Sequence, residues 1–288
     1  MAGTRELRRR IKSIRSTAQI TKAMQMVAAS KMRKAQEAAI NVRPFIRLLY
    51  RIQRKAVTRV VDFAHPLLEV RPVKKRLIIL VASDKGLCGA LNSNLFRLAG
   101  RYDPKMTVFI TAGRKAAQFV ARTRRTLVAD FPYGDTPRFA EARAIAALAR
   151  DLFLKGEVDE VVLVATRFIN TLTQQAVALE YLPVGEIKGL KMPESESPEV
   201  LAADTTEFRF EPDAHAILSY LLGHYLNTLL YILLLNAKAS EQSARMVSMK
   251  NATDNANGMI KDLTLHYNKL RQGAITQELL EIAGGQSN

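Results

Sequence analysis

No proline follows Pro212, so the last 76 residues of the chain can form one uninterrupted helix. Proline removes a backbone hydrogen-bond donor and its ring clashes with the preceding helical turn, which makes its absence over this length a strong constraint. The first 43 residues also lack proline. The sequence therefore predicts a long helix at each end of the chain, with Thr4 and Asp213 as the expected N-caps.

An apolar seam runs along the C-terminal segment. Steps of alternately three and four residues visit 17 positions over eight heptads, and only three of these positions are polar. This 3.5-residue spacing is typical of a left-handed coiled coil. At about 1.5 Å per residue the helix would be roughly 100 Å long. The seam consists of Leu218, Leu221, Tyr225, Thr228, Ile232, Leu235, Ala239, Gln242, Met246, Met249, Thr253, Ala256, Ile260, Leu263, Tyr267, Leu270 and Ala274.

The N-terminal segment carries a weaker seam with many small residues, and Pro44 is expected to kink its helix without ending it. We expect the two helices to pair as a long antiparallel coiled coil. The alternative, in which both helices pack on a central globule, stays open, although the centre is expected to be too small to cover two such stripes. The second seam consists of Ile11, Ile14, Ala18, Thr21, Gln25, Ala28, Met32, Ala35, Ala39, Val42, Ile46, Leu49, Gln53, Ala56 and Val60.

The middle of the chain alternates apolar runs with helical patterns. This alternation is typical of an α/β fold with a parallel sheet and crossover helices, here a Rossmann-like domain. We predict an N-terminal coiled-coil helix over 1–60, a central α/β domain over 76–211 and a C-terminal coiled-coil helix over 213–284. Strands are expected at 77–82, 106–111, 158–168, 173–184 and 208–212, helices at 92–101, 113–124 and 138–154, and an acidic loop at 193–206.

The charge is distributed unevenly. The formal net charge is +16, and residues 1–76 hold 20 Lys and Arg against four acidic residues, whereas the rest of the chain holds 23 of each sign. Such asymmetry predicts a polyanionic partner: a nucleic acid, an anionic membrane surface or an acidic protein.

Catalytic motifs are missing from the sequence. The four histidines are not paired at metal-ligand spacing, and the single cysteine, Cys88, has no adjacent base. The glycine-rich segment SDKGLCGALNSN (83–94) follows a predicted strand, but it matches neither of the common phosphate-binding patterns. Ser83 and Asp84 are expected to cap the helix that follows. We therefore expect no catalytic residue, no metal and no cofactor.

Three segments carry a family resemblance. The segment ELRRRIKSIRSTAQITKAMQMVAASKMRKAQ (6–36) resembles the N-terminal helix of the gamma subunit of F-type ATP synthases. SDKGLCGALNSN (83–94) resembles the central motif of that family, and ASEQSARMVSMKNATDNANGMIKDLTLHYNKLRQGAITQELLEI (239–282) resembles its C-terminal helix. The three segments occur in the family's order and span nearly the whole chain.

The resemblance implies a non-catalytic central-stalk rotor, present in one copy per complex. It would transmit torque from a proton-driven c-ring to the ring of alpha and beta subunits, beside the epsilon subunit. Residues expected to form a catch with a beta-subunit loop are Arg271, Gln272 and Thr276. Those expected where the N-terminal helix meets the lower ring are Lys22, Met24 and Lys31.

The expected location is the cytoplasmic face of the bacterial plasma (inner) membrane, as a peripheral subunit. The basic N-terminus lacks the apolar run of a signal peptide, and we expect no transmembrane span. Three alternatives stay open: a basic coiled coil that binds nucleic acid, a nucleotide-dependent enzyme and a scaffold coiled coil. The first is disfavoured because residues 1–43 contain no aromatic side chain for reading bases.

Overall fold

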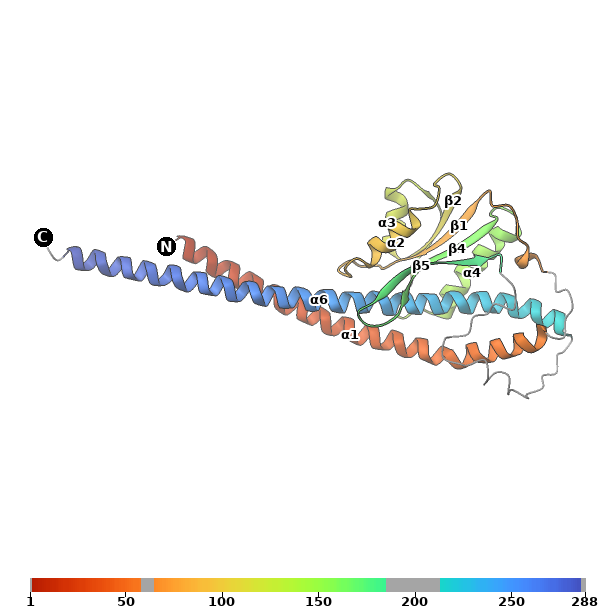
Figure 1. Cartoon of the computed structure of the whole chain (residues 1–288), viewed down its shortest axis with the longest axis horizontal. Coiled ribbons are helices and arrows are strands. Elements are labelled where there is room, and N and C mark those ends of the chain that lie inside the picture. Colours follow the sequence, from red (N-terminus) through yellow and green to blue (C-terminus); the bar gives the residue numbers. More distant parts are fainter. Residues whose placement is uncertain (1, 58–64, 185–212, 286–288) are drawn as a thin grey trace. The chain divides into compact units, whose positions relative to one another are not determined.

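The computed structural model describes residues 2–57, 65–184 and 213–285 (Figure 1). The strand expected at 208–212 and the loop expected at 193–206 lie outside these ranges. The elements are α1 (Ala2–Val57), the 3-10 helix η1 (Pro66–Leu68), β1 (Arg76–Val81), α2 (Leu91–Ala99), β2 (Thr107–Ala112), α3 (Arg114–Arg122), β3 (Thr126–Phe131), α4 (Phe139–Leu154), β4 (Glu160–Phe168), β5 (Gln174–Leu182) and α6 (Ala214–Gly285).

Both terminal helices form. Helix α6 begins after Asp213, whose Oδ1 accepts a hydrogen bond from the Ala216 amide at 2.8 Å, which confirms the expected N-cap. Helix α1 continues through Pro44 to Val57, as predicted. The N-cap expected at Thr4 is wrong, because α1 already begins at Ala2 and Thr4 lies inside its first turn.

The chain divides into two compact units. The first joins Met1–Ser30 to Arg245–Asn288, and the second comprises Lys31–Ala244. In the first unit the buried residues, apart from Arg245, come from the two predicted seams. These residues are Ile11, Ala18 and Ala28 on α1 and Met249, Thr253 and Ala256 on α6. The seam spacing therefore predicted which faces of the two helices pack together.

The second unit contains a five-stranded sheet in the order β3-β2-β1-β4-β5. Strands β1 to β4 are parallel, whereas β5 pairs with β4 in the antiparallel direction. The connection between β4 and β5 is too short for a crossover helix, so these strands form a hairpin. The mixed sheet agrees with the predicted α/β class. Strand β3 was not predicted from the sequence.

Helices cover both faces of the sheet (Figure 1). Ile78 and Leu80 of β1 face a cluster that includes side chains of α2 and α3. Their neighbours Leu77 and Ile79 face the opposite cluster, which includes side chains of α4 and α6. The α6 residues in this second cluster are Leu222, Leu226, Leu230, Leu233, Leu234 and Ala237.

Helix α6 is therefore a core helix of the α/β domain over part of its length. This finding corrects the expectation that the centre of the chain is too small to cover a terminal helix. Between 222 and 237 one face of α6 packs on the sheet, while the seam residues Leu218, Leu235 and Ala239 are also buried. The packing of a terminal helix on the globule and the pairing of α1 with α6 thus both occur.

One helical segment among the described residues, Ala216–Gln277, is long and apolar enough to cross a membrane by length and composition. Its leucines at 222, 226, 230, 233 and 234 are buried in the domain core. Burial against the sheet accounts for the apolar character of this stretch without any contact with lipid.

Candidate functional site

The pairing of the two terminal helices centres on two threonines in the first unit. The hydroxyls of Thr21 and Thr253 lie 2.7 Å apart, and either can be the donor of this bond. Each hydroxyl also lies within hydrogen-bond distance of a carbonyl oxygen of its own helix, Ala18 at 3.1 Å for Thr21 and Met249 at 2.9 Å for Thr253. Small side chains occupy neighbouring seam positions, with Ala18 and Ala28 on α1 and Ala256 on α6. Small residues at a helix interface allow the two backbones to approach closely.

The threonine pair sets the register of the two helices. Counting outward along antiparallel helices from Thr21 and Thr253 places Ile11 near Leu263 and the start of α1 near Leu270. Ile11 is 8% exposed and Leu263 is partly buried, whereas Leu270 is 40% exposed. The seam on α6 therefore loses its partner close to Leu270.

Replacing both threonines by valine tests this register. Thr21→Val or Thr253→Val alone leaves the other hydroxyl without its cross-helix partner and is expected to lower the free energy of unfolding by about 1 kcal/mol. The double variant replaces both polar groups by apolar groups of similar shape and should fall short of the sum of the single changes. Urea denaturation of the full chain gives the three values. Strictly additive losses would show that the two hydroxyls do not interact.

Charged side chains of α1 in the first unit face solvent. Arg10 forms an ion pair with Glu6 at 2.8 Å, and both side chains remain more than half exposed. Six further basic residues of this stretch lie at least partly exposed, namely Arg5, Arg8, Arg9, Lys12, Arg15 and Lys22. The excess positive charge of the N-terminal segment is therefore available to a partner.

The three residues expected to form the catch lie on the exposed C-terminal part of α6. Arg271, Gln272 and Thr276 all face solvent. The Thr276 hydroxyl donates to the Gln272 carbonyl oxygen at 2.9 Å, which places these two residues one turn apart on the same side of the helix. Their role in binding a partner stays a prediction.

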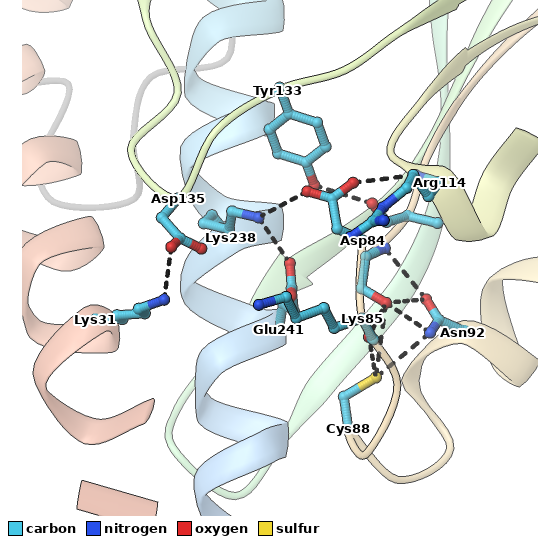
Figure 2. A network of polar contacts seen from close by, with 12 residues as sticks. Lys31, Asp84, Lys85, Cys88, Asn92, Arg114, Tyr133, Asp135, Lys238 and Glu241 are labelled. Atoms are coloured by element: carbon cyan, nitrogen blue, oxygen red, sulfur yellow. Dashed lines mark hydrogen bonds and ion pairs between the residues drawn. The ribbon is translucent and has the colours of Figure 1, made fainter. Parts of the chain in front are cut away.

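The residues expected at the lower ring differ in their surroundings. Lys22 is exposed and Met24 is half-buried. Lys31, in the second unit, forms an ion pair with Asp135 at 2.6 Å (Figure 2). This pair attaches α1 to the loop between β3 and α4. The ammonium group of Lys31 thus has an internal partner, and its contact with another subunit stays a prediction.

The Lys31 ammonium lowers the pKa of Asp135. Its hydrogen bond to the carboxylate is the largest cause, and partial burial of the carboxylate opposes the shift. A carboxylate with a depressed folded-state pKa stabilises the fold above its ordinary pKa. This contribution is lost as the pH falls through the depressed value. More than half of the Asp135 side chain is exposed, so solvent screening keeps the contribution small.

The glycine-rich segment after β1 forms internal bonds. Asp84 Oδ1 accepts a hydrogen bond from the Arg114 amide at 3.1 Å, so it caps α3. The prediction that Ser83 and Asp84 cap α2 is wrong, because the N-cap of that helix is Ala90 and it has no side-chain cap. Ser83 bonds to Asn92 and to the Lys85 carbonyl, and Asn92 also donates to the buried Cys88 sulfur.

A buried polar cluster lies where α6 passes the ends of β1 and β2. The Lys238 ammonium lies 3.0 Å from Glu241 Oε2, 3.8 Å from Asp84 Oδ2 and 4.6 Å from the centre of the Tyr133 ring (Figure 2). The Tyr133 hydroxyl donates to the Ala82 carbonyl at 3.0 Å. Burial, together with the Glu241 and Asp84 charges, raises the pKa of Tyr133 well above its ordinary value.

This cluster occupies the position at which open α/β sheets bind ligands. Such ligands lie beyond the carboxyl ends of the parallel strands, where the strand order reverses. Here the chain runs outward from β1 to β2 in one direction and to β4 in the other, so the reversal lies at β1. Lys238 and Glu241 from α6 lie beyond this end of the sheet.

Lys238 and Glu241 were not predicted from the sequence, because Lys and Glu are almost never fully buried. A signal was nevertheless present. These are the only two Asp, Glu, Lys or Arg residues between 214 and 244, and they stand three positions apart. A helix without a charged face is expected to be buried all round, and its one charged pair is expected to be internal.

No constellation for catalysis emerges among residues 2–57, 65–184 and 213–285. No group of three or more His, Cys, Asp and Glu in these ranges could hold a metal. His224 packs against Phe45, Phe139 and Tyr220, and the His65 ring accepts a hydrogen bond from the Leu67 amide at the start of η1. These histidines have structural partners.

Comparisons with known proteins agree with the architecture. A family model described as ATP synthase matches residues 3–288. The ATP synthase gamma chain of Opitutus terrae is 46% identical over 99% of this chain and 98% of its own length. The chain belongs to the ATP synthase gamma-chain family. Another member, from Methylacidiphilum infernorum, is 41% identical over 99% of both chains.

Chains in solved structures of ATP synthases share the fold. A chain of the central stalk and c-ring structure of the Tetrahymena thermophila mitochondrial ATP synthase matches with 26% identity and a TM-score of 0.57, over 81% of this chain and 99% of that chain. A chain of the Euglena gracilis mitochondrial enzyme matches with 19% identity and a TM-score of 0.67, over 99% and 94%, and supports the fold alone. The resemblance identified from the three sequence segments is confirmed, and so is the class of central-stalk subunit.

Proposed function

We propose that this gamma chain is the non-catalytic rotor shaft of a bacterial ATP synthase. The observation that carries the proposal is the buried seam between α1 and α6, which the Thr21–Thr253 bond holds in one register. Two helices paired in this way are stiffer than one helix, and a shaft that transmits torque needs such stiffness.

The partners that we propose are the alpha and beta subunits of the catalytic ring, the epsilon subunit and the c-ring. The family resemblance implies that proton flow turns the c-ring and that the uneven faces of gamma move successive beta subunits through open, loose and tight states. One copy per complex suits this action, because a symmetric shaft could not give three beta subunits different states at one time.

The exposed basic face of α1 suits a ring whose beta subunits present an acidic loop. Attraction between exposed charges is screened beyond about 8–10 Å at physiological salt. An exposed ion pair contributes about 0–1 kcal/mol. Contacts of this strength can guide the shaft and still break at every step of rotation.

The proposed location is the cytoplasmic face of the plasma membrane, as a peripheral subunit held through the c-ring. The apolar stretch of α6 has a place in the core of the α/β domain, so attachment to the membrane does not require this helix to enter lipid.

Purification from native membranes tests the rotor proposal. An affinity-tagged full chain is expected to bring down larger ATPase subunits together with membrane-embedded ones. Inside-out vesicles from cells that lack the chain should show no ATP-driven proton pumping until the chain is restored. A chain that purifies alone, or vesicles that pump equally well without it, would overturn the proposal.

Arg271→Ala and Gln272→Ala test the proposed catch with the beta subunit. Each change is expected to lower the ATPase rate of the assembled complex by about two- to tenfold, since one hydrogen bond contributes about 0.5–1.5 kcal/mol. Assembly should be nearly unchanged, because both residues are exposed in the chain itself. The control for Arg271 is Lys269→Ala, which removes an exposed cation two residues away, on a different face of α6 from Arg271. Equal turnover in all three variants would remove Arg271 and Gln272 from the catch.

Two truncations test how far the shaft must extend. Deleting 279–288 removes residues beyond the seam and is expected to preserve most ATP-driven pumping. Deleting 262–288 also removes Leu263 and Tyr267, which are partly buried, and should abolish most of it. Both truncated chains are compared in vesicles with equal amounts of assembled complex. The same loss from both deletions would contradict the role of the seam.

A further inference from the structure

Helix α6 carries a single charged pair over the part that packs on the α/β domain. From 214 to 244, Lys238 and Glu241 are the only Asp, Glu, Lys or Arg residues. Their side chains are 1% and 4% exposed, and they bond to each other at 3.0 Å. A buried charge is strongly unfavourable unless it is paired, so these two groups tolerate few arrangements.

The partners of this pair come from separate loops of the domain. Asp84 follows β1 and approaches the Lys238 ammonium at 3.8 Å, while Tyr133 follows β3 and places its ring 4.6 Å from the same ammonium (Figure 2). Asp84 is itself fixed by the Arg114 amide, and Tyr133 by the Ala82 carbonyl. The two loops therefore offer the ammonium one defined position.

Most of the buried side chains next to the pair are small. Ala237, Ala239, Ser240 and Ser243 are buried and short, whereas Gln242 is a longer buried side chain next to the pair. Long side chains that interdigitate resist sliding and rotation of a helix, whereas a smooth surface of small residues does so weakly. Between 237 and 243 the charged pair thus distinguishes one register from the next more sharply than the small side chains do, while the leucines at 222–234 resist sliding farther along the helix.

Several other polar contacts of α6 can be remade after a shift along the helix. Arg150 and Tyr181 donate to the carbonyl oxygens of Gly223 and Leu226, and every turn of a helix offers such oxygens. Ser243 donates to the Thr171 carbonyl at 2.7 Å. An equivalent hydroxyl stands one turn earlier at Ser240, and it is buried with no hydrogen-bond partner among the described residues.

We propose that Lys238 and Glu241, through Asp84, lock α6 against rotation and sliding in the α/β domain, so that torque on the domain reaches the shaft without slip. Both are positioning residues, since neither touches a reacting group. The inference rests on the rotor function proposed above. It assigns to the charged pair the register of α6 beside Asp84 and Tyr133, in addition to the apolar packing of the leucines between 222 and 234.

The test replaces the pair by apolar residues of similar size. The complex with Lys238→Met and Glu241→Met is expected to assemble and to hydrolyse ATP at the rate of the unchanged complex. Its ratio of proton pumping to ATP hydrolysis in inside-out vesicles should fall at least about twofold, as it would if about half of the rotors slipped. The control is Lys155→Met with Asp151→Met, which removes an exposed ion pair of the same chemistry at the end of α4 and should leave the ratio unchanged.

Asp84→Asn is a second variant, and it disturbs the core less because the Asp84 side chain is partly exposed. Asparagine keeps an oxygen for the Arg114 amide but removes the carboxylate from Lys238, so a smaller fall in the same ratio is expected. If both altered complexes keep the original ratio, the lock is overturned; if the double variant fails to assemble, Asp84→Asn alone decides. Failure of the unchanged chain to support pumping would instead overturn the rotor function.

Discussion

Replacing Glu241 by Met is expected to lower the free energy of unfolding of the full chain by about 3–5 kcal/mol. The change keeps the volume of the side chain but removes the carboxylate that lies 3.0 Å from the buried Lys238 ammonium. Asp84, at 3.8 Å and partly exposed, cannot replace it in the same geometry. The large loss comes from the desolvated charge that remains, and the measurement is urea denaturation followed by circular dichroism.

The double variant Lys238→Met with Glu241→Met separates the charge from the packing. Because both charges are gone, it should regain most of the lost free energy, and apolar replacement of a buried ion pair is often neutral or stabilising. A Glu241→Met loss below about 1 kcal/mol would show that solvent reaches the ammonium. A double variant as unstable as the single one would show that shape, and not charge, holds α6 at this position.

Gly113→Ala is the second change with a large expected effect, about 2–6 kcal/mol of lost stability. Gly113 has φ of 96° and ψ of 139°, a conformation that L residues rarely adopt. An added Cβ would lie 2.1 Å from the Ala82 carbonyl oxygen and 3.2 Å from the Tyr133 ring. Strain and collision therefore act together, at the point where β2 ends and Tyr133 approaches Lys238.

Gly156→Ala is the matched control for the collision. Gly156 also has positive φ, at 72°, but an added Cβ there meets no atom within 4 Å. It should lose only the strain, about 1–2 kcal/mol. Both variants are compared by the midpoint of urea unfolding at constant slope. Equal losses would mean that the Ala82 carbonyl moves aside and that the close approach carries no cost of its own.

The pairing of α1 with α6 could be predicted because it depends on a local pattern. A 3.5-residue spacing shows which side of each helix is apolar, and the buried contacts at Thr21, Thr253 and Ala256 all fall on the two predicted seams. The uninterrupted course of α6 and its N-cap at Asp213 could be predicted for the same reason, since a proline or a capping side chain affects only the neighbouring turns of a helix. The domain boundaries predicted at 60, 76, 211 and 213 stay predictions.

Features that depend on distant contacts were not predicted, or only in part. Strand β3 lies at an edge of the sheet and Thr126, Leu127 and Val128 are exposed, so it lacks the apolar run of a buried strand. Between 222 and 237, α6 is apolar on most of its surface, and no periodicity could show which side faces the sheet. The burial of Lys238 depends on Asp84 and Tyr133, which lie more than 100 positions away in the sequence.

The residues expected to meet other subunits could be placed in the structure but not tested by it. Arg271, Gln272 and Thr276 are exposed, as a contact surface requires. Their energetic contribution arises only in the assembled complex, because the bonds that matter form with another chain. Lys31 differs from these three residues, because its ammonium already has an internal partner in Asp135.

Helix α6 belongs to the core of the α/β domain, yet it is among the last parts of the chain to be synthesised. Strand β1 leaves the ribosome early, yet the leucines of α6 that cover Leu77 and Ile79 come from 222 to 234, among the last quarter of the residues translated. Domains made during translation generally fold as units once their residues are present. The part of this face that α4 does not cover must therefore stay exposed and prone to aggregation until nearly the entire polypeptide has been made.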